Sequence, residues 1–232
     1  APQLTIGKHD KATASSYIEI YDENFFMMTA NGFLSYTLFD NLNSLKSNLI
    51  EMKSIKSNIF ELINYPEFYK ESKFGIKDLL IHNNKIYISY SNLLKDYGYG
   101  RDHDNCYNTS ILVANLNYKE LNFKKFYTPN DCASKKNDYG FFNPHHSGGR
   151  MVALKDKIIF THGDYKIRKL AQDDKSEMGK IIEINKNGSF NRFLSKGHRN
   201  PQGLYFDVSN NILLSTEHGP DGGDEVNIIE TN

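Results

Sequence analysis

Short runs of apolar and β-branched residues, separated by polar turns, recur along most of the chain. Three such runs lie in its first part and read SYIEIYD, NFFMMTA and GFLSYTLF. Each has the length of a strand, is rich in residues that favour β-structure, and is bounded by turn residues. The pattern predicts β-strands from the first part of the chain onward.

Three later stretches repeat one device, in which two strands are joined by a tight polar turn. They read GIKDLLIHNNKIYISYS, GGRMVALKDKIIFTHGD and PQGLYFDVSNNILLSTEHG. The Asn-Asn, Lys-Asp and Ser-Asn-Asn turns are typical of β-hairpins. A second hairpin follows the first two of these stretches, in SILVANLNYKELNFKKFYT and GKIIEINKNGSFNRFLS. The repeating unit is therefore two hairpins, or four strands.

Repeats of four short strands are typical of propeller blades, and a two-sheet sandwich is the rival fold. The recurring order of hairpin, excursion and hairpin favours the propeller. We predict an all-β fold in which residues 1–232 form a single partial β-propeller domain of four-stranded antiparallel blades. Counting the units gives an arc of about three and a half blades. An open arc leaves strand edges uncovered, so we expect the natural protein to continue beyond Asn232.

One segment, Leu42–Ile63, does not follow this pattern. Its apolar positions fit either a helix or two strands, and serines and asparagines interrupt it. The segment is therefore either a helix or two strands, and both interpretations stay open.

Composition narrows the possible partners. The 28 Lys and Arg residues balance the 28 Asp and Glu residues, which argues against a nucleic-acid partner. No apolar run approaches the ~20 residues that a membrane-spanning helix needs. The chain begins APQLTIGKHD, without the apolar run of a signal peptide. We expect a globular protein with neither a nucleic-acid partner nor a membrane span.

The two cysteines, Cys106 and Cys132, flank a predicted hairpin that turns near Tyr118. Residues opposite each other in an antiparallel pair have Cα atoms roughly 4.5–5.5 Å apart, which suits a disulfide. The alternatives are two independent thiols, or a metal pair that lacks its further ligands. We predict the disulfide, which implies an oxidising compartment such as a periplasm.

Polar residues gather at the connections of successive units. They lie in NPHHSGGRMV, in GHRNPQGLYF and in TEHGPDGGDEVN. In a propeller, equivalent loops of successive blades converge at one end of the central channel. We therefore expect these three motifs to meet in space.

The motifs GHRNPQGLYFD and LLSTEHGPDGGDEVNII resemble the glucose/sorbosone dehydrogenase family of soluble quinoprotein sugar dehydrogenases. HHSGGRMV with KIIFTHGD is similar to the preceding block of that family, and earlier strands match further blocks in order. The resemblance is strongest at Gly197–Asn232. It implies a six-bladed propeller that oxidises a small aldose-type sugar with pyrroloquinoline quinone (PQQ) and calcium. It also implies a periplasmic or secreted location.

The resemblance assigns catalysis to His146, as the base that takes the hydroxyl proton while hydride leaves carbon. Imidazole suits this role because its pKa lies near neutrality. In many relatives an Asp precedes this His and orients it, whereas here the preceding residue is His145. Arg199 and Asn200 fall on the positions that contact the quinone. An Arg offers a fixed cationic fork to carboxylate or quinone oxygens.

The same resemblance places calcium at HGPDGGDE. The carbonyl groups of Gly219 and Pro220 match those that bind the ion next to the quinone, and Ca²⁺ prefers such oxygen ligands. Glu225 matches a ligand of a second, structural calcium in some relatives. The alternative for Glu225 is a solvated carboxylate in a turn.

One departure from the family pattern leaves a non-catalytic function open, and a third function is also considered. Active relatives carry a carboxamide where this chain has Lys73 or Glu71, which favours a non-catalytic propeller that serves as a binding module. A metal-dependent lactonase would need several carboxylates facing the channel, and only three candidates are present, without a ligand pattern: Asp164, Asp207 and Asp224. The joint presence of His146, Arg199, Asn200 and the Gly-Pro pair favours the dehydrogenase.

Overall fold

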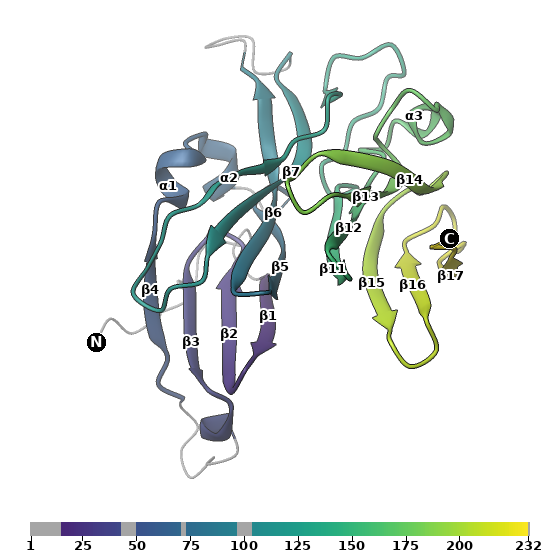
Figure 1. Ribbon diagram of the computed structural model, residues 1–232. Helices are drawn as coiled ribbons and strands as arrows, with labels where there is room; N and C mark the ends of the chain where they lie inside the picture. The colour runs from purple at the N-terminus through teal and green to yellow at the C-terminus, as the bar shows by residue number, and fades with distance from the viewer. Residues whose placement is uncertain (1–14, 43–49, 71–72, 97–103, 232) are drawn as a thin grey trace.

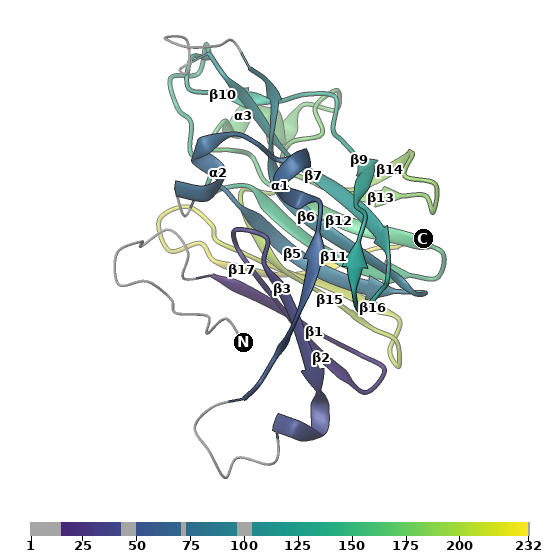
Figure 2. The same cartoon turned by 90° about the vertical axis from the view of Figure 1, so that its left-hand side faces the viewer.

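Strands dominate the fold and form four largely antiparallel sheets that follow one another along the chain (Figure 1). The computed structural model describes residues 15–42, 50–70, 73–96 and 104–231. From the side of the first sheet, the sheets are stacked one behind another (Figure 2). This confirms the all-β class and the arc of successive propeller blades.

The first sheet holds the three strands that the opening pattern predicts, together with a fourth. Its strands, in order across the sheet, are β1 (Ser16–Tyr21), β2 (Asn24–Thr29), β3 (Leu34–Leu38) and β4 (Lys53–Ser57). The short strand β8 (Glu120–Leu121) joins β4 in parallel from a later part of the chain. Successive side chains of a strand point to opposite faces of the sheet, so Phe26 and Met28 of β2 share one face, and both are fully buried.

The ambiguous segment Leu42–Ile63 is neither one helix nor two strands. It contains β4 and then the single-turn helix α1 (Ile59–Leu62), and residues 43–49 lie outside the described ranges. The short 3₁₀ helix η1 (Phe39–Leu42) precedes it, and α2 (Pro66–Lys70) follows it. No helix in the described ranges is long and apolar enough to cross a membrane.

The second sheet is built on the first predicted hairpin. Its strands are β5 (Ile76–His82), β6 (Lys85–Lys95), β7 (Cys106–Asn115), β9 (Lys124–Tyr127) and β10 (Ala133–Ser134). The β5–β6 turn needs two left-handed residues, and Asn83 and Asn84 supply them at φ 50° and 55°. β7 pairs with β9 as predicted, but their connection is no tight turn, since it carries β8 to the first sheet.

Cys106 and Cys132 form the disulfide that the sequence predicts, with their Cα atoms 5.4 Å apart. The neighbouring strand is β10 rather than β9, because Ser134 pairs with Cys106 in the β7–β10 ladder. Closing a loop with a sequence separation of 26 stabilises the fold by roughly 3–4 kcal/mol in the chain-entropy account.

The third and fourth sheets follow the same plan. The third contains β11 (Gly148–Leu154), β12 (Lys157–His162), β13 (Lys180–Ile184) and β14 (Phe190–Lys196), with α3 (Arg168–Gln172) in the excursion between its hairpins. The fourth contains β15 (Pro201–Asp207), β16 (Ile212–Glu217) and β17 (Glu225–Ile229). It therefore has one strand more than the single hairpin that the repeat pattern predicts.

The first strands of the four sheets form the inner wall of the arc. β11 packs against both β5 and β15, and β1 packs against β5. Three apolar clusters fill the spaces between neighbouring sheets. Fully buried members of these clusters include Phe26 and Ile88, Ile111 and Phe160, and Ile159 and Leu213.

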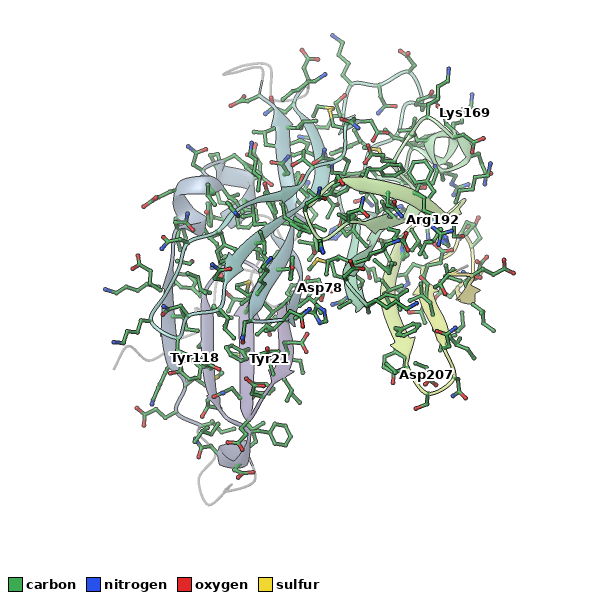
Figure 3. The ribbon with its side chains drawn as sticks, viewed as in Figure 1. Tyr21, Asp78, Tyr118, Lys169, Arg192 and Asp207 are labelled. Atoms are coloured by element: carbon green, nitrogen blue, oxygen red, sulfur yellow. A yellow bond between two sulfur atoms is a disulfide. The ribbon has the colours of Figure 1, made fainter. Side chains whose placement is uncertain are left out.

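Arg150 ties these inner strands together from β11. Its guanidinium forms an ion pair of 2.9 Å with Asp78 of β5, a residue that Figure 3 shows between the second and third sheets. The same group donates to the Gln202 carbonyl oxygen of β15 at 2.7 Å and lies 5.2 Å from the ring centre of Tyr17 in β1. The second Asp78 oxygen accepts the Met151 N–H at 2.7 Å. One side chain thus joins four strands.

We expect Arg150→Met to lower the free energy of unfolding by about 2–3 kcal/mol at pH 7, below the usual cost of breaking a fully buried pair because Arg150 is partly exposed. Burial raises the pKa of Asp78, and Arg150 opposes that rise. Without Arg150 the folded state binds this proton more tightly than the unfolded state does, so the deficit should shrink as the pH falls from 7 to 5. Urea unfolding at both pH values measures the effect.

The matched control is Asp78→Asn combined with Arg150→Met, which keeps an acceptor for the Met151 N–H and removes the unpaired charge. We expect the double variant to be more stable at pH 7 than Arg150→Met alone. Equal stability of the two variants would show that the ion pair does not contribute.

Candidate active site

The candidate site lies at the end of the arc where β11 and β15 begin and β16 ends (Figure 1). Hydrogen bonds join the three motifs there. The Asp164 N–H donates to the Arg199 carbonyl oxygen at 2.9 Å, and the His218 N–H donates to that of Asn200 at 3.3 Å. The Asn200 side-chain oxygen accepts the Gly148 N–H at 3.3 Å. The structure therefore brings together segments that are remote in sequence.

His146 is paired with a carboxylate. Its Nδ1 lies 3.3 Å from Oδ1 of Asp164, and the two residues are only 8% and 1% exposed. A carboxylate can only accept a hydrogen bond, so Nδ1 carries a hydrogen, and in the neutral imidazole the lone pair is then on Nε2. That arrangement allows the imidazole to accept a proton from a substrate hydroxyl.

The turn after β12 holds this pair in place. Tyr165 and Lys166 are left-handed, at φ 51° and 69°, and the turn directs the Lys166 N–H to Asp164 Oδ1 at 2.6 Å. The Tyr165 N–H donates to the His146 carbonyl oxygen at 2.9 Å. A Cβ at Gly163 would lie 2.1 Å from that same oxygen, so only glycine permits this approach.

The carboxylate that contacts His146 comes from Asp164 and not from the position directly before His146, where the family pattern has an Asp. His145 stands at that position and is exposed, whereas Asp164 approaches from the next strand of the same sheet. Sequence reasoning considered Asp164 only as a possible metal ligand. The sequence did contain a signal for this contact. Asp164 ends the motif THGD, directly after the second strand of the hairpin that follows His146.

Arg199 and Asn200 lie directly before β15, beside the end of β16. The Arg199 N–H donates to Glu217 Oε2 at 2.9 Å, and its guanidinium donates to the carbonyl oxygens of His218, at 3.0 Å, and of Gly219. Its Nε is buried and has no partner within the described part of the chain. Asn200 is 5% exposed. The arginine therefore keeps an uncommitted donor.

Glu217 supports this arginine and was not predicted from the sequence. It is buried and lies 3.2 Å from His198 Nδ1, while His198 Nε2 contacts Ser195 Oγ at 2.9 Å. Burial alone would raise the pKa of Glu217. The contact with His198 and the backbone N–H groups of Arg199 and Asn200 outweigh it and lower that pKa. Glu217 is thus an anion that fixes the backbone on which Arg199 stands.

The predicted calcium ligands are only partly assembled. The Gly219 carbonyl accepts from Arg199, and the Pro220 carbonyl accepts a backbone N–H of its own turn at 2.9 Å. Glu225 is exposed at the start of β17, and its carboxylate accepts from Asn227 at 3.1 Å. Among the described residues, no group of three or more His, Cys, Asp or Glu side chains is placed to hold a metal ion.

Two lysines, Lys73 and Lys77, lie near the loop that carries His146. Lys77 belongs to the inner strand β5, and its Nζ donates to the Lys73 carbonyl oxygen at 2.8 Å. Burial lowers the pKa of Lys77 to about 7. Burial, followed by Lys77 and Lys73, lowers the pKa of His145, so both lysines act on the loop that carries His146. Glu71 lies outside the described residues.

The comparisons with known proteins agree with the motifs. A family model described as Glucose / Sorbosone dehydrogenase matches residues 44–232. The aldose sugar dehydrogenase YliI of Escherichia coli K12 is 28% identical over 192 residues, which cover 72% of this chain and 47% of that protein. Quinoprotein glucose dehydrogenase B of Acinetobacter calcoaceticus is 36% identical over 115 residues, which cover 36% and 24%. Each match spans less than half of the relative's length.

Solved structures share the fold. The soluble aldose sugar dehydrogenase from Escherichia coli in its apo-form gives a TM-score of 0.67 at 21% identity, over 94% of this chain and 60% of that one. The PQQ-bound aldose sugar dehydrogenase from Streptomyces coelicolor gives 0.61 at 15% identity, over the same shares. At such identities the likeness establishes the architecture only.

Proposed function

The chain belongs to the glucose/sorbosone dehydrogenase family, and on that premise we propose that the full-length protein is a quinoprotein oxidoreductase that oxidises a hydroxyl of an aldose-type sugar. His146 takes the hydroxyl proton on Nε2, and Asp164 stabilises the imidazolium that forms. PQQ, when bound, supplies the acceptor for the hydride. Arg199 and Asn200, with Lys73 and Lys77 nearby, would hold the anionic groups of that cofactor.

The buried His146–Asp164 pair beside Arg199 is the observation that carries this proposal. Asp164 is only 1% exposed, and a histidine that served only to pack the loop would not require a buried carboxylate beside it. Burying such a charge is costly unless a partner compensates for it. The pair therefore supports an enzyme rather than a binding module that kept only the scaffold.

The side chains around the site fit a quinone that carries carboxylates. The buried Nε of Arg199 lacks a partner within the described ranges, and an anion would satisfy it. Burial lowers the pKa of Lys77, and an anion bound beside it would favour its charged form. These positions support the assignment of Arg199 to cofactor binding.

Calcium would bind at the turn that contains Gly219 and Pro220. Gly219 and Pro220 offer two carbonyl oxygens, whereas Ca²⁺ takes about 6–8 oxygen ligands. The guanidinium of Arg199 already contacts the first of them. Further ligands would have to come from the quinone, from water, or from residues other than those described.

The disulfide favours a location outside the cytosol for this protein. Disulfides persist in oxidising compartments and are rare in the cytosol. The bridge between Cys106 and Cys132 therefore supports a periplasmic or secreted protein.

Dye-linked oxidation by the full-length protein tests the proposal. Sugar-dependent dye reduction should require added PQQ and should increase further with Ca²⁺ and fall on chelation. The lack of oxidation in every combination, in a folded protein that binds PQQ, would favour the binding module. Quinone-dependent turnover that ignores chelation would remove calcium from the proposal.

Arg199→Ala should weaken PQQ binding by about 10–100-fold, because it removes a charge-assisted contact from a partly buried position. Titration of the apoprotein with PQQ, followed by absorbance, measures the dissociation constant. Arg192→Ala is the matched control, since it removes an arginine from β14, and it should bind PQQ like the wild type. Unchanged affinity in Arg199→Ala would overturn its role.

A further inference from the structure

A cavity of about 430 Å³ is lined by segments that lie close in sequence to His146 and Asp164. Two chain segments line it, one just before the His146 motif and one just after Asp164. Its lining residues are Asp138, Tyr139, Phe141, Lys166, Arg168 and Lys169. Figure 3 shows Lys169 beside α3 at the upper right of the molecule.

The walls of this cavity are held by the same atoms that hold the base. Oδ1 of Asp164 accepts both the Lys166 N–H, at 2.6 Å, and the imidazole of His146, at 3.3 Å. On the other wall, the Asn143 N–H donates to the Tyr165 carbonyl oxygen at 2.8 Å, and the Tyr165 N–H donates to that of His146 at 2.9 Å. A ligand in this cavity would therefore occupy a fixed position relative to the base.

The chemistry of the lining is cationic and aromatic. Lys166 Nζ lies 5.5 Å from the ring centre of Phe141, and Lys169 Nζ lies 5.5 Å from that of Tyr139. These contacts hold the ammonium groups beside the cavity, which reduces the entropy lost when a ligand binds. The two rings are also 60% and 41% exposed, so each keeps a free face.

The positive charge is local and unbalanced. Three cations line the cavity against one carboxylate, that of Asp138, although the chain as a whole has no net charge. Lys166, Arg168 and Lys169 form no ion pair with any described carboxylate. The nearest buried carboxylate, Asp164, is already paired with His146. The uncompensated cations therefore favour an anionic ligand.

We propose that this cavity is a substrate subsite that binds an acidic sugar unit, of the uronate type, in a saccharide whose neighbouring unit presents its hydroxyl to His146. The carboxylate of that unit would contact Lys166 and Lys169, and its C–H face would pack on the exposed aromatic rings. A cavity of this size is within the usual range of about 300–1,000 Å³ for small-ligand sites. This inference rests on the proposed function, because it takes His146 as the reacting centre.

Titration calorimetry on the full-length protein without quinone tests binding independently of oxidation. The probes are tetragalacturonate, which is acidic, and maltotetraose, which is a neutral saccharide of equal length. Tetragalacturonate should bind at least tenfold more tightly at low salt, and the difference should narrow as ionic strength rises. Equal affinities for the two saccharides would overturn the proposal.

Charge-removing variants locate the binding. Lys166→Gln combined with Lys169→Gln should weaken tetragalacturonate binding by about 5–30-fold. Lys186→Gln, which removes an exposed lysine from the β13–β14 turn, should bind like the wild type. Equal weakening in Lys186→Gln would show that the binding is not confined to the cavity. Thermal melts of all variants verify that they fold.

Two further outcomes separate the parts of the inference. Displacement of tetragalacturonate by inorganic phosphate at similar concentration would reveal a bare anion site and overturn the recognition of a sugar. Specific acidic-saccharide binding with no oxidation of any sugar would sustain the subsite and contradict the proposed function. Oxidation of neutral sugars without acidic-saccharide binding would sustain the function and contradict the subsite.

Discussion

The His146→Gln variant of the full-length protein should lose sugar-oxidising turnover while it binds PQQ like the wild type. Loss of a positioned general base lowers kcat by about 10²–10⁴-fold, or roughly 3–5 kcal/mol of barrier. Glutamine cannot take a proton near neutral pH, but its amide can still donate to Asp164. The buried carboxylate therefore stays paired and the fold should persist. Dye-linked kinetics give kcat, and apoprotein titration gives the PQQ affinity.

His82→Gln is the matched control for this experiment. His82 lies at the end of β5 beside the Asn-Asn turn and contacts the Lys155 carbonyl oxygen at 3.3 Å. Its replacement should leave both turnover and cofactor affinity unchanged. If His146→Gln instead lost the quinone and Arg199→Ala retained it, the roles assigned to these two residues would be exchanged. Full activity in His146→Gln would end its role as the base.

Much of the fold follows from local signals in the sequence. The Asn83-Asn84 turn needs left-handed backbone, which asparagine tolerates, and the alternation on either side sets which face is buried. Such short-range rules identify the hairpins. They do not identify β8, which pairs in parallel with β4 across more than sixty residues of chain, from Lys56 to Glu120. They also do not identify β17, because the connection from β16 to β17 is not a tight turn.

The candidate site likewise contains residues that local motifs predict and one residue, Asp164, that they do not. His146, Arg199 and Asn200 stand in contiguous motifs, so the sequence could predict that they meet once the fold was assumed. Asp164 reaches His146 only because Gly163 allows the two loops to approach closely. That approach depends on three-dimensional packing and not on residue spacing, so the sequence, which has His145 directly before His146, does not predict it.

Asp164→Asn should lower kcat by roughly 30–1,000-fold with little change in the affinity for PQQ. The amide oxygen can keep both contacts of Oδ1, to His146 and to the Lys166 N–H, so the geometry should survive. What is lost is the negative charge that stabilises the imidazolium as it forms. At the short distance between these groups, and with an effective dielectric constant of about 20, that charge contributes about 2–4 kcal/mol after allowance for relaxation. Steady-state kinetics measure the loss.

Two comparisons decide whether this loss arises from charge or from structure. Asp207→Asn changes an exposed carboxylate that accepts from Ser209 and Asn210 in its own turn, and it should leave kcat unchanged. Asp164→Ala removes the charge and also leaves the Lys166 N–H without its acceptor, so it should lose stability as well as turnover. If Asp164→Asn melts as low as Asp164→Ala, or if its kcat equals that of the wild type, the carboxylate does not act on His146 through its charge.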